Sequence, residues 1–236
     1  GMWQAIEAEL RDEALRFGRD AEITVVRGAN SLAWTVRARD NAAIAELNRR
    51  LVERRLAARN AYLARHLRHQ VGEYVIIDFA AVARAFKDPL RVVTRALAED
   101  RAAGSGDRAR ISQALAFFQA IPYARLEPSQ RQGSDFLSAP ALLAQNRGDC
   151  DSKSAALGAV LQTYVPSRKL AIVTMPGHAI LAVDLAPQPG DRLIRTAGRS
   201  LVALEVAGPH LAPVGYVDPV TDRLLAAGGV EVWPLN

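Results

Sequence analysis

Hydrophobic positions recur with two different periods along this 236-residue chain. In the first third, spacings of three and four predict a helix over residues 3–17 and a long amphipathic helix between residues 41 and 70. Between them, residues 21–38 predict two short strands around the turn sequence RGANS. The segment EYVIIDF predicts a strand that approaches a helix near Ala80, and Pro89 indicates that this helical region is divided in two.

The pattern changes in the second half of the chain. The sequences ISQALAFFQAI and APALLAQ predict helices, and a further helix begins near Cys150. After it, KLAIVTM, GHAILAVDL and SLVALEVAG predict strands, so the rest of the chain is expected to be almost entirely strands. Helices followed by strands indicate an α+β fold. The run at residues 101–110 predicts a linker between a mostly helical region with a small hairpin, residues 1–104, and a core, residues 105–236.

Composition indicates a globular protein. With 50% hydrophobic and 23% charged residues, the chain can bury a core without disulfides. Its single cysteine cannot form an intramolecular disulfide, so a reduced cytosol and a bacterial periplasm both stay open. No window reaches the ~18 uninterrupted apolar residues of a membrane span, and the N-terminus lacks a signal-peptide pattern. Gly1 ahead of Met2 indicates an altered start, so a removed leader or anchor stays open as well.

The net charge of +5 is concentrated on the long helix. Its outer face carries most of the arginines between residues 41 and 70, against two glutamates: Arg49, Arg50, Arg54, Arg55, Arg59, Arg65 and Arg68, with Glu46 and Glu53. Its expected inner face consists of Ile44, Leu47, Leu51, Val52, Leu56, Leu63 and Leu67. A solvated helix face is the favoured interpretation, and a surface for nucleic acid or anionic lipid is the alternative. No zinc spacing, aromatic stacking motif or helix-turn-helix signature supports nucleic-acid binding.

The sequence NRGDCDSKSAALGAVL, residues 146–161, places the cysteine at the polar start of a helix. Asp149 is the expected N-cap, and Gly148 allows a sharp turn into the helix. The unpaired N–H groups of a helix N-terminus favour a thiolate at Cys150, although Asp149 and Asp151 oppose it. A nucleophile also needs a base.

His178 is the candidate base. It opens the strand GHAILAVDL directly after the break made by Pro176 and Gly177. The other histidines are interpreted as surface or loop residues: His66, His69 and His210. A structural role for His178 is the alternative, and its position after a helix-N-terminal cysteine favours the catalytic one.

Glu205 is the candidate for the acid that orients the imidazole, because it is the one charge in an apolar run. Asp184 lies roughly 20 Å from His178 along the strand, and Asp191 sits in a turn. If the two strands pair antiparallel with His178 opposite Glu205, the buried carboxylate gains a partner. The same register pairs further positions: Ile180 with Ala203, Ala182 with Leu201, and Asp184 with Arg199. The alternative places Glu205 at a strand edge, in solvent.

These segments resemble the transglutaminase-like superfamily, including its bacterial cysteine-peptidase branch. The resemblance rests on GDCDSKSAAL, GHAILAV, the following acidic strand and the upstream FFQAIPY, and covers roughly residues 107–217. It implies a papain-like core in which the nucleophile-bearing helix packs on an antiparallel sheet, with a triad of Cys150, His178 and Glu205. Glutamate replaces the family's aspartate and lengthens the orienting arm by one methylene.

The resemblance also implies an oxyanion site and a reaction. The Cys150 backbone N–H is the default oxyanion donor, and Gln119 is a second candidate that is otherwise an ordinary helix residue. Ser152 and Ile180 stand where the family often has an aromatic residue. We expect a cysteine-nucleophile acyl-transfer enzyme with a thioester intermediate. Hydrolysis of a protein or peptide substrate would make it a thiol protease or amidase, which bacterial members favour.

Three alternatives stay open. Resolution of the thioester by an amine would make the protein a transglutaminase, and a triad without turnover would make it an inactive binding scaffold. The basic helix could instead bind nucleic acid or an anionic membrane. No cofactor is expected, and a metal site is disfavoured because no CxxC or HxxxH pattern accompanies the candidate ligands. The substrate and the oligomeric state are not determined by the sequence.

Overall fold

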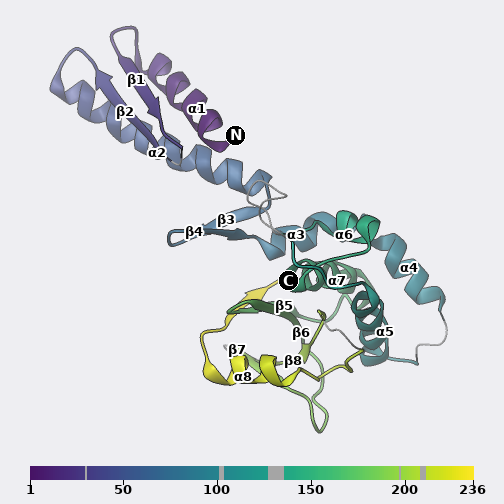
Figure 1. Cartoon of the computed structure of the whole chain (residues 1–236). Coiled ribbons are helices and arrows are strands. Elements are labelled where there is room, and N and C mark those ends of the chain that lie inside the picture. The colour runs from purple at the N-terminus through teal and green to yellow at the C-terminus, as the bar shows by residue number, and fades with distance from the viewer. Residues whose placement is uncertain (30, 101–103, 127–135, 197, 208–210) are drawn as a thin grey trace. The chain divides into compact units, whose positions relative to one another are not determined.

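The computed structural model divides the chain into two compact units, Gly1–Asp78 and Phe79–Asn236 (Figure 1). It describes all residues except 30, 101–103, 127–135, 197 and 208–210. The division therefore falls at residue 78, ahead of the expected boundary after residue 104. The physical reason is that helices α3 (Phe79–Phe86) and α4 (Arg91–Glu99) pack on a helix of the second unit, α7 (Cys150–Tyr164). The predicted division of this region at Pro89 is confirmed.

The described residues of unit 1 form two helices and two hairpins. In chain order its elements are α1 (Met2–Phe17), β1 (Glu22–Arg27), β2 (Leu32–Arg37), α2 (Asn41–Arg65), β3 (Arg68–Val71) and β4 (Tyr74–Ile77). The hairpin β1–β2 packs on α1 and α2, and the shared core includes Ile6, Leu10, Leu47 and Leu51. These elements confirm the predicted helix over residues 3–17, the two strands within residues 21–38 and the strand in EYVIIDF. The long helix ends at Arg65, before the expected residue 70, and the strand β3 that follows it was not predicted.

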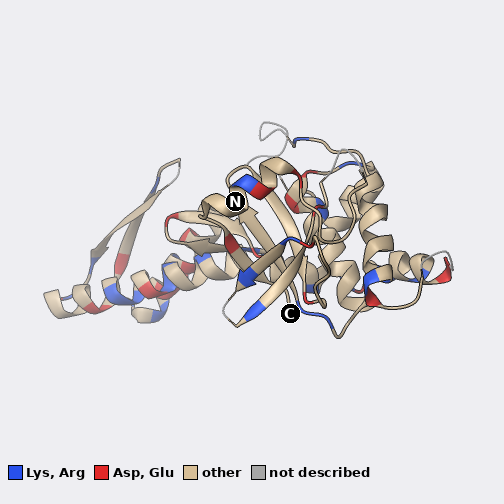
Figure 2. Ribbon diagram, turned by 90° about the horizontal axis from the view of Figure 1, so that it is seen from below, with Lys and Arg blue, Asp and Glu red and all other residues tan. Residues whose placement is uncertain are grey.

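Four arginines of α2 have partners within unit 1: Arg49, Arg50, Arg54 and Arg55. Arg49 and Arg50 both donate to Glu46, and these hydrogen bonds lower the pKa of Glu46 to about 2. Arg54 pairs with Glu9 of α1, and the Arg55 guanidinium lies 5.3 Å from the centre of the Trp34 ring. Figure 2 shows basic and acidic segments interleaved along α2. Much of the positive charge of this helix is therefore balanced locally.

The inner face of α2 is narrower than expected. Ala43, Leu47, Leu51 and Leu63 are its buried residues, whereas Val52 and Leu56 are 49% and 56% exposed. The expectation that all seven apolar positions face inward is wrong at these two. Among the described residues, no helix combines the length and hydropathy needed to cross a bilayer.

Unit 2 is an α+β unit, as the sequence predicts. Its remaining helices are α5 (Asp107–Ala120), α6 (Ala139–Gln145) and α8 (Pro219–Ala227). Its strands are β5 (Leu170–Met175), β6 (His178–Val183), β7 (Leu193–Thr196), β8 (Arg199–Leu204) and β9 (Glu231–Pro234). They form one antiparallel sheet in the order β7-β8-β6-β5-β9. The helix α7 packs on β5 and β6, and α3 to α6 pack around α7 (Figure 1).

Two features of the sheet correct the sequence analysis. Helix α8 occupies a region expected to be strand, and its Leu224 and Leu225 pack on the sheet. The register of β6 on β8 is shifted by two residues, because Ala182 pairs with Ala203 and not with Leu201. Arg199 accordingly pairs with Thr196 of β7 and not with Asp184. A shift of two keeps every side chain on its own face, so the hydrophobic pattern alone could not distinguish the two registers.

Candidate active site

Cys150 is the first residue of α7, as predicted. The N-cap Asp149 is extended, and its carboxylate accepts the Ser152 backbone N–H. The chain ahead of the cysteine is held to the segment after α5: the Gly148 N–H donates to the Pro122 carbonyl, and the Ala124 N–H donates to the Gly148 carbonyl. Cys150 therefore has a fixed position at the helix start, and it is partly exposed.

Glycine is required at position 148 by close packing. A Cβ atom there would lie 2.7 Å from Leu142 Cδ1 and 3.2 Å from Lys153 Cγ. The backbone of Gly148 is not in the left-handed region, unlike that of Gly177. The sequence analysis singled out the right residue, but the reason is the close approach of α6 and not a sharp turn.

The packing of α7 on the sheet brings Cys150 to the start of β6. A Cβ atom on Gly158 would lie 3.5 Å from Leu181 Cδ1, so the helix and β6 are in contact at this level. Cys150 precedes Gly158 by eight helical residues, which is about 12 Å along α7. His178 precedes Leu181 by three strand residues, which is about 10 Å along β6, so both residues lie a similar distance from the Gly158–Leu181 contact. The two functional side chains therefore meet at the same end of the sheet.

The turn between β5 and β6 sets the position of His178. Pro176 and Gly177 link Met175 to His178, and Gly177 has a φ of +71°, which a glycine adopts without strain. This confirms the predicted break. The histidine thus opens β6 directly after a rigid two-residue turn, which limits how its ring can move.

His178 contacts both other members of the predicted triad. Its Nε2 lies 2.9 Å from Glu205 Oε1, and the ring also lies near enough to Cys150 for the two groups to interact, with the remaining ring nitrogen, Nδ1, available to face the sulfur. Burial lowers the pKa of His178, but the hydrogen bonds to Cys150 and Glu205 and the charges of both groups outweigh it and raise the pKa to about 10. The three candidate side chains therefore converge, with the imidazole between the sulfur and the acid.

Glu205 reaches the histidine diagonally. The last pair of the β6–β8 ladder is Leu181 with Leu204, so continuing it by one residue places Glu205 across from Ile180. His178 lies on the same face, two residues further along β6. A diagonal neighbour is within reach of a long side chain. Glu205 is 3% exposed, so the alternative of an acid in solvent is wrong.

Gln119 has a different position from the one expected of an oxyanion donor. Its Nε2 donates to the Glu205 carbonyl at 2.7 Å and to the Ala212 carbonyl at 3.0 Å, and its Oε1 accepts the Ala212 N–H at 3.1 Å. Both amide protons are therefore used by the backbone. Gln119 holds the segment that carries Glu205, and the Cys150 N–H remains the candidate oxyanion donor.

Lys153 is a second buried clamp that the sequence analysis did not identify. It lies one turn after Cys150 and is fully buried, and its Nζ donates to the Ile121 carbonyl at 2.8 Å and to the Ala207 carbonyl at 3.0 Å. Burial lowers its pKa to about 8. This side chain ties the nucleophile helix to the segments after α5 and after Glu205.

Thr221 and Asp218 complete the surroundings of Glu205, and the sequence analysis did not identify them. The Thr221 hydroxyl lies 2.9 Å from Glu205 Oε2 and 3.0 Å from Asp218 Oδ2, and Asp218 caps α8. The motif DPVT, an aspartate followed by proline and then threonine, is typical of a helix start and could have revealed α8. Its link to Glu205 is a tertiary contact that no local pattern encodes.

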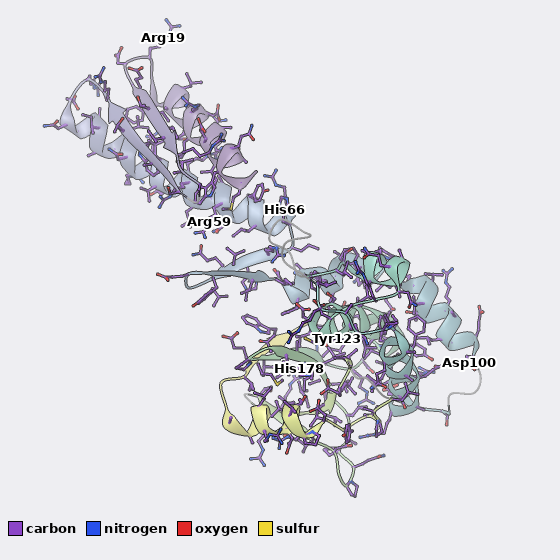
Figure 3. The ribbon with its side chains drawn as sticks, viewed as in Figure 1. Arg19, Arg59, His66, Asp100, Tyr123 and His178 are labelled. Carbon is purple, nitrogen blue, oxygen red and sulfur yellow. The ribbon has the colours of Figure 1, made fainter. Side chains whose placement is uncertain are left out.

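Tyr123 lies beside the nucleophile on the segment that pairs with Gly148. Burial and the nearby charges of Cys150 and Asp149 raise its pKa, although Arg125 opposes the shift. Figure 3 shows Tyr123 and His178 in the same part of unit 2. Its side chain is 48% exposed and so can contact a substrate at the sulfur. The quoted motif FFQAIPY contains this residue, but nothing in the motif marks its role.

Three other residues that the sequence analysis weighed lie outside this site: His66, His69 and Asp191. His66 caps α2 and stacks on Tyr62, with ring centres 4.1 Å apart, and His69 lies in β3. His210 falls outside the described residues. Asp191 pairs with Arg108 at 2.6 Å, as befits an acid that was excluded from the triad.

His178, Glu205 and Asp218 also form a group whose ligand atoms lie within 4.8 Å of one another. A metal ion would need the lone pair of His178 Nε2. That nitrogen faces Glu205 in a hydrogen bond, and the raised pKa keeps a proton on the ring at neutral pH. The arrangement therefore favours a proton over a metal ion.

Comparisons of the chain with protein-family models, curated proteins and solved structures find no match.

Proposed function

We propose that this protein is a cysteine-nucleophile acyl-transfer enzyme, acting as a peptidase or amidase through Cys150, His178 and Glu205. The observation that carries the proposal is the position of the His178 imidazole, which lies beside Cys150 and hydrogen-bonds to Glu205. A thiol, an imidazole and a buried carboxylate in this order are the groups that thiol acyl transfer requires. The papain-like core implied by the resemblance is part of the same proposal.

The reaction follows from the order of the groups. The proton of the Cys150 thiol already resides on His178 in the resting ion pair, and the thiolate attacks the carbonyl carbon of the substrate. The Cys150 backbone N–H, at the start of a helix, donates to the oxyanion that forms. His178 then gives its proton to the departing amine, which leaves a thioester on Cys150. Glu205 keeps the ring in the orientation that serves both steps.

Water or an amine completes the reaction, and the choice defines the enzyme class. Water attacks the thioester carbon with His178 as base, which releases the acid and restores the thiol. A primary amine in place of water gives a new amide, which is the transglutaminase alternative. The raised pKa of His178 keeps the ring protonated at neutral pH. The ring therefore carries the proton that the departing amine needs when the thioester forms.

The test is to incubate the protein with a peptide library and follow products by mass spectrometry, with and without an excess of a fluorescent primary amine. Hydrolysis products that disappear in Cys150→Ala support a peptidase, and amine-labelled products support a transglutaminase. The acyl-enzyme should add the acyl mass to Cys150 and lose it on treatment with hydroxylamine. A reactive Cys150 without any products or adduct supports the inactive scaffold and contradicts the proposal.

A further inference from the structure

The acid of the site does not act alone, because two more side chains surround it. Thr221 and Asp218 both come from the start of α8, a helix on the sheet face that α7 does not cover. Glu205 lies between them and His178: Oε1 faces the imidazole, and Oε2 faces the Thr221 hydroxyl. The contacts thus form a chain that runs from the sulfur to the first turn of α8.

The Thr221 hydroxyl has one proton and two carboxylate neighbours. It lies 2.9 Å from Glu205 Oε2 and 3.0 Å from Asp218 Oδ2. Asp218 already accepts the Val220 and Thr221 backbone N–H groups and is partly exposed to water. Glu205 is 3% exposed, and no other donor to its Oε2 is found among the described residues. Because an unsatisfied buried carboxylate oxygen is costly, the hydroxyl proton belongs to Glu205.

Asp218 adds negative charge near the imidazole. Its carboxylate, Glu205 and His178 offer atoms within 4.8 Å of one another, so two acids face one ring. Burial raises the pKa of Asp218, but the Thr221 and Val220 backbone N–H groups and the charge of His178 outweigh it and lower this pKa. The groups that face His178 are thus Cys150, Glu205 and Asp218. Two carboxylates that face one imidazole stabilise its charged form.

We infer that Thr221 and Asp218 are positioning residues of this site: the Thr221 hydroxyl orients Glu205 toward His178, and the Asp218 carboxylate stabilises the charged ring from the start of α8. This inference deepens the proposed function and rests on it for its catalytic meaning. The protonation of the His178 ring and the reactivity of the Cys150 sulfur can both be measured without any substrate. Helix α8 thereby becomes part of the site, although it lies more than 40 residues after His178.

The test uses Thr221→Val, Thr221→Ser and Asp218→Asn. Valine has the shape of threonine without the hydroxyl, serine restores the hydroxyl, and asparagine retains an N-cap without the charge. Two readouts are taken: the titration midpoint of the His178 ring by NMR, and the rate of Cys150 alkylation by iodoacetamide at pH 6. Matched controls are Asp222→Asn, which removes a charge from the same helix at its pair with Arg192, and Thr163→Val.

Thr221→Val should lower the His178 midpoint by about one unit, which is a tenfold change in the proton equilibrium of the ring, and it should slow alkylation of Cys150. Thr221→Ser should restore both values, and Asp218→Asn should lower the midpoint while both controls leave it unchanged. If Thr221→Val folds poorly, the serine and asparagine variants still decide the question. Unchanged values in Thr221→Val, or a serine variant no better than valine, would overturn the inference.

The two proposals fail in different ways. Suppose the variants change the His178 titration midpoint and the Cys150 alkylation rate, but the protein gives no product from a peptide library. The positioning role would then stand, and acyl transfer would be contradicted. Turnover that depends on Cys150 but is insensitive to Thr221 and Asp218 would retain the function and overturn the positioning role.

Discussion

Glu205 Oε1 lies 2.9 Å from His178 Nε2, although Glu205 stands diagonally from His178 across the β6–β8 ladder. Because of this diagonal offset, the Glu205 side chain must be long enough to reach the His178 ring. A glutamate has one methylene more than an aspartate and so spans a diagonal that a shorter acid would not. The Gln119 amide holds the Glu205 backbone, and the Thr221 hydroxyl holds its outer oxygen. The acid is thereby fixed at both ends.

Substitutions of Glu205 can test separately the length of its side chain and its negative charge. Glu205→Asp retains the charge but loses the reach, and Glu205→Gln retains the length but loses the charge. Both variants should lower turnover by about 10²- to 10⁴-fold, the range for loss of an orienting acid. The ring of His178 should titrate at lower pH in both. Glu231→Gln, an exposed glutamate on β9, is the control. Full activity in Glu205→Asp would contradict the diagonal geometry.

The pKa of His178 predicts a decline in both activity and stability at high pH. Its folded-state value of about 10 lies above the ordinary 6.5, so the folded protein holds an extra proton between these values. The stabilisation is fully present below pH 6.5 and is lost as the pH rises through 10. Activity should fall over the upper part of this window, as the ring loses the proton that it gives to the leaving amine. An NMR titration should give a midpoint near 10 in the wild type and a much lower one in Cys150→Ala. A midpoint near 6.5 in the wild type would contradict the ion pair.

Substitution of Gln119 should lower the stability of the folded protein, because its amide holds buried backbone groups and is not placed as an oxyanion donor. Gln119→Leu removes the donor for two buried carbonyls and the acceptor for the Ala212 N–H. The free energy of unfolding should fall by about 3 kcal/mol or more, at roughly 1–3 kcal/mol for each buried group left unsatisfied. Gln162→Leu, which removes one amide donor to the Leu235 carbonyl, should cost less. Denaturant unfolding measures both. A stable Gln119→Leu protein with a large loss of turnover would instead restore the oxyanion role.

Lys153 predicts an opposite dependence of stability on pH. Its folded-state pKa of about 8 lies below the ordinary 10.5, so burial of the ammonium costs free energy below pH 8. That cost is relieved as the pH rises from 8 to 10.5, which should stabilise the protein by about 3 kcal/mol. Subtracting the unfolding profile of Lys153→Met from that of the wild type isolates this effect from that of His178. Lys169→Met, an exposed lysine of the same unit, is the control. A flat difference profile would show that Lys153 is not buried as a cation.

Local patterns predicted much of this fold and the identity of the candidate triad. The periodicities around residues 3–17 and 139–164 have unambiguous helical spacing, and the Pro176–Gly177 turn marks the start of β6. Glu205 was identified because a lone charge in an apolar strand needs a partner. These inferences depend on features that each segment carries by itself.

Other features depend on partners far away in the sequence. The register of β6 on β8 was missed by two residues because the face pattern repeats with that period. The roles of Gln119 and Lys153 follow from which backbone carbonyls lie beside them, and these belong to segments roughly 30 to 90 residues away. The boundary at residue 78 depends on α3 and α4 packing on α7, which no linker composition reveals.

The reactivity of Cys150 at pH 6 tests the central claim most directly. An ordinary cysteine with a pKa of about 8.5 is less than ~1% thiolate at this pH, whereas the account requires a nucleophilic sulfur at Cys150 whose proton is on His178. Iodoacetamide should therefore alkylate wild-type Cys150 at least ~10-fold faster than Cys150 in His178→Ala or Glu205→Gln, with the rate measured by intact-protein mass spectrometry. Equal rates in the wild type and in His178→Ala would contradict a working unit of sulfur, imidazole and acid.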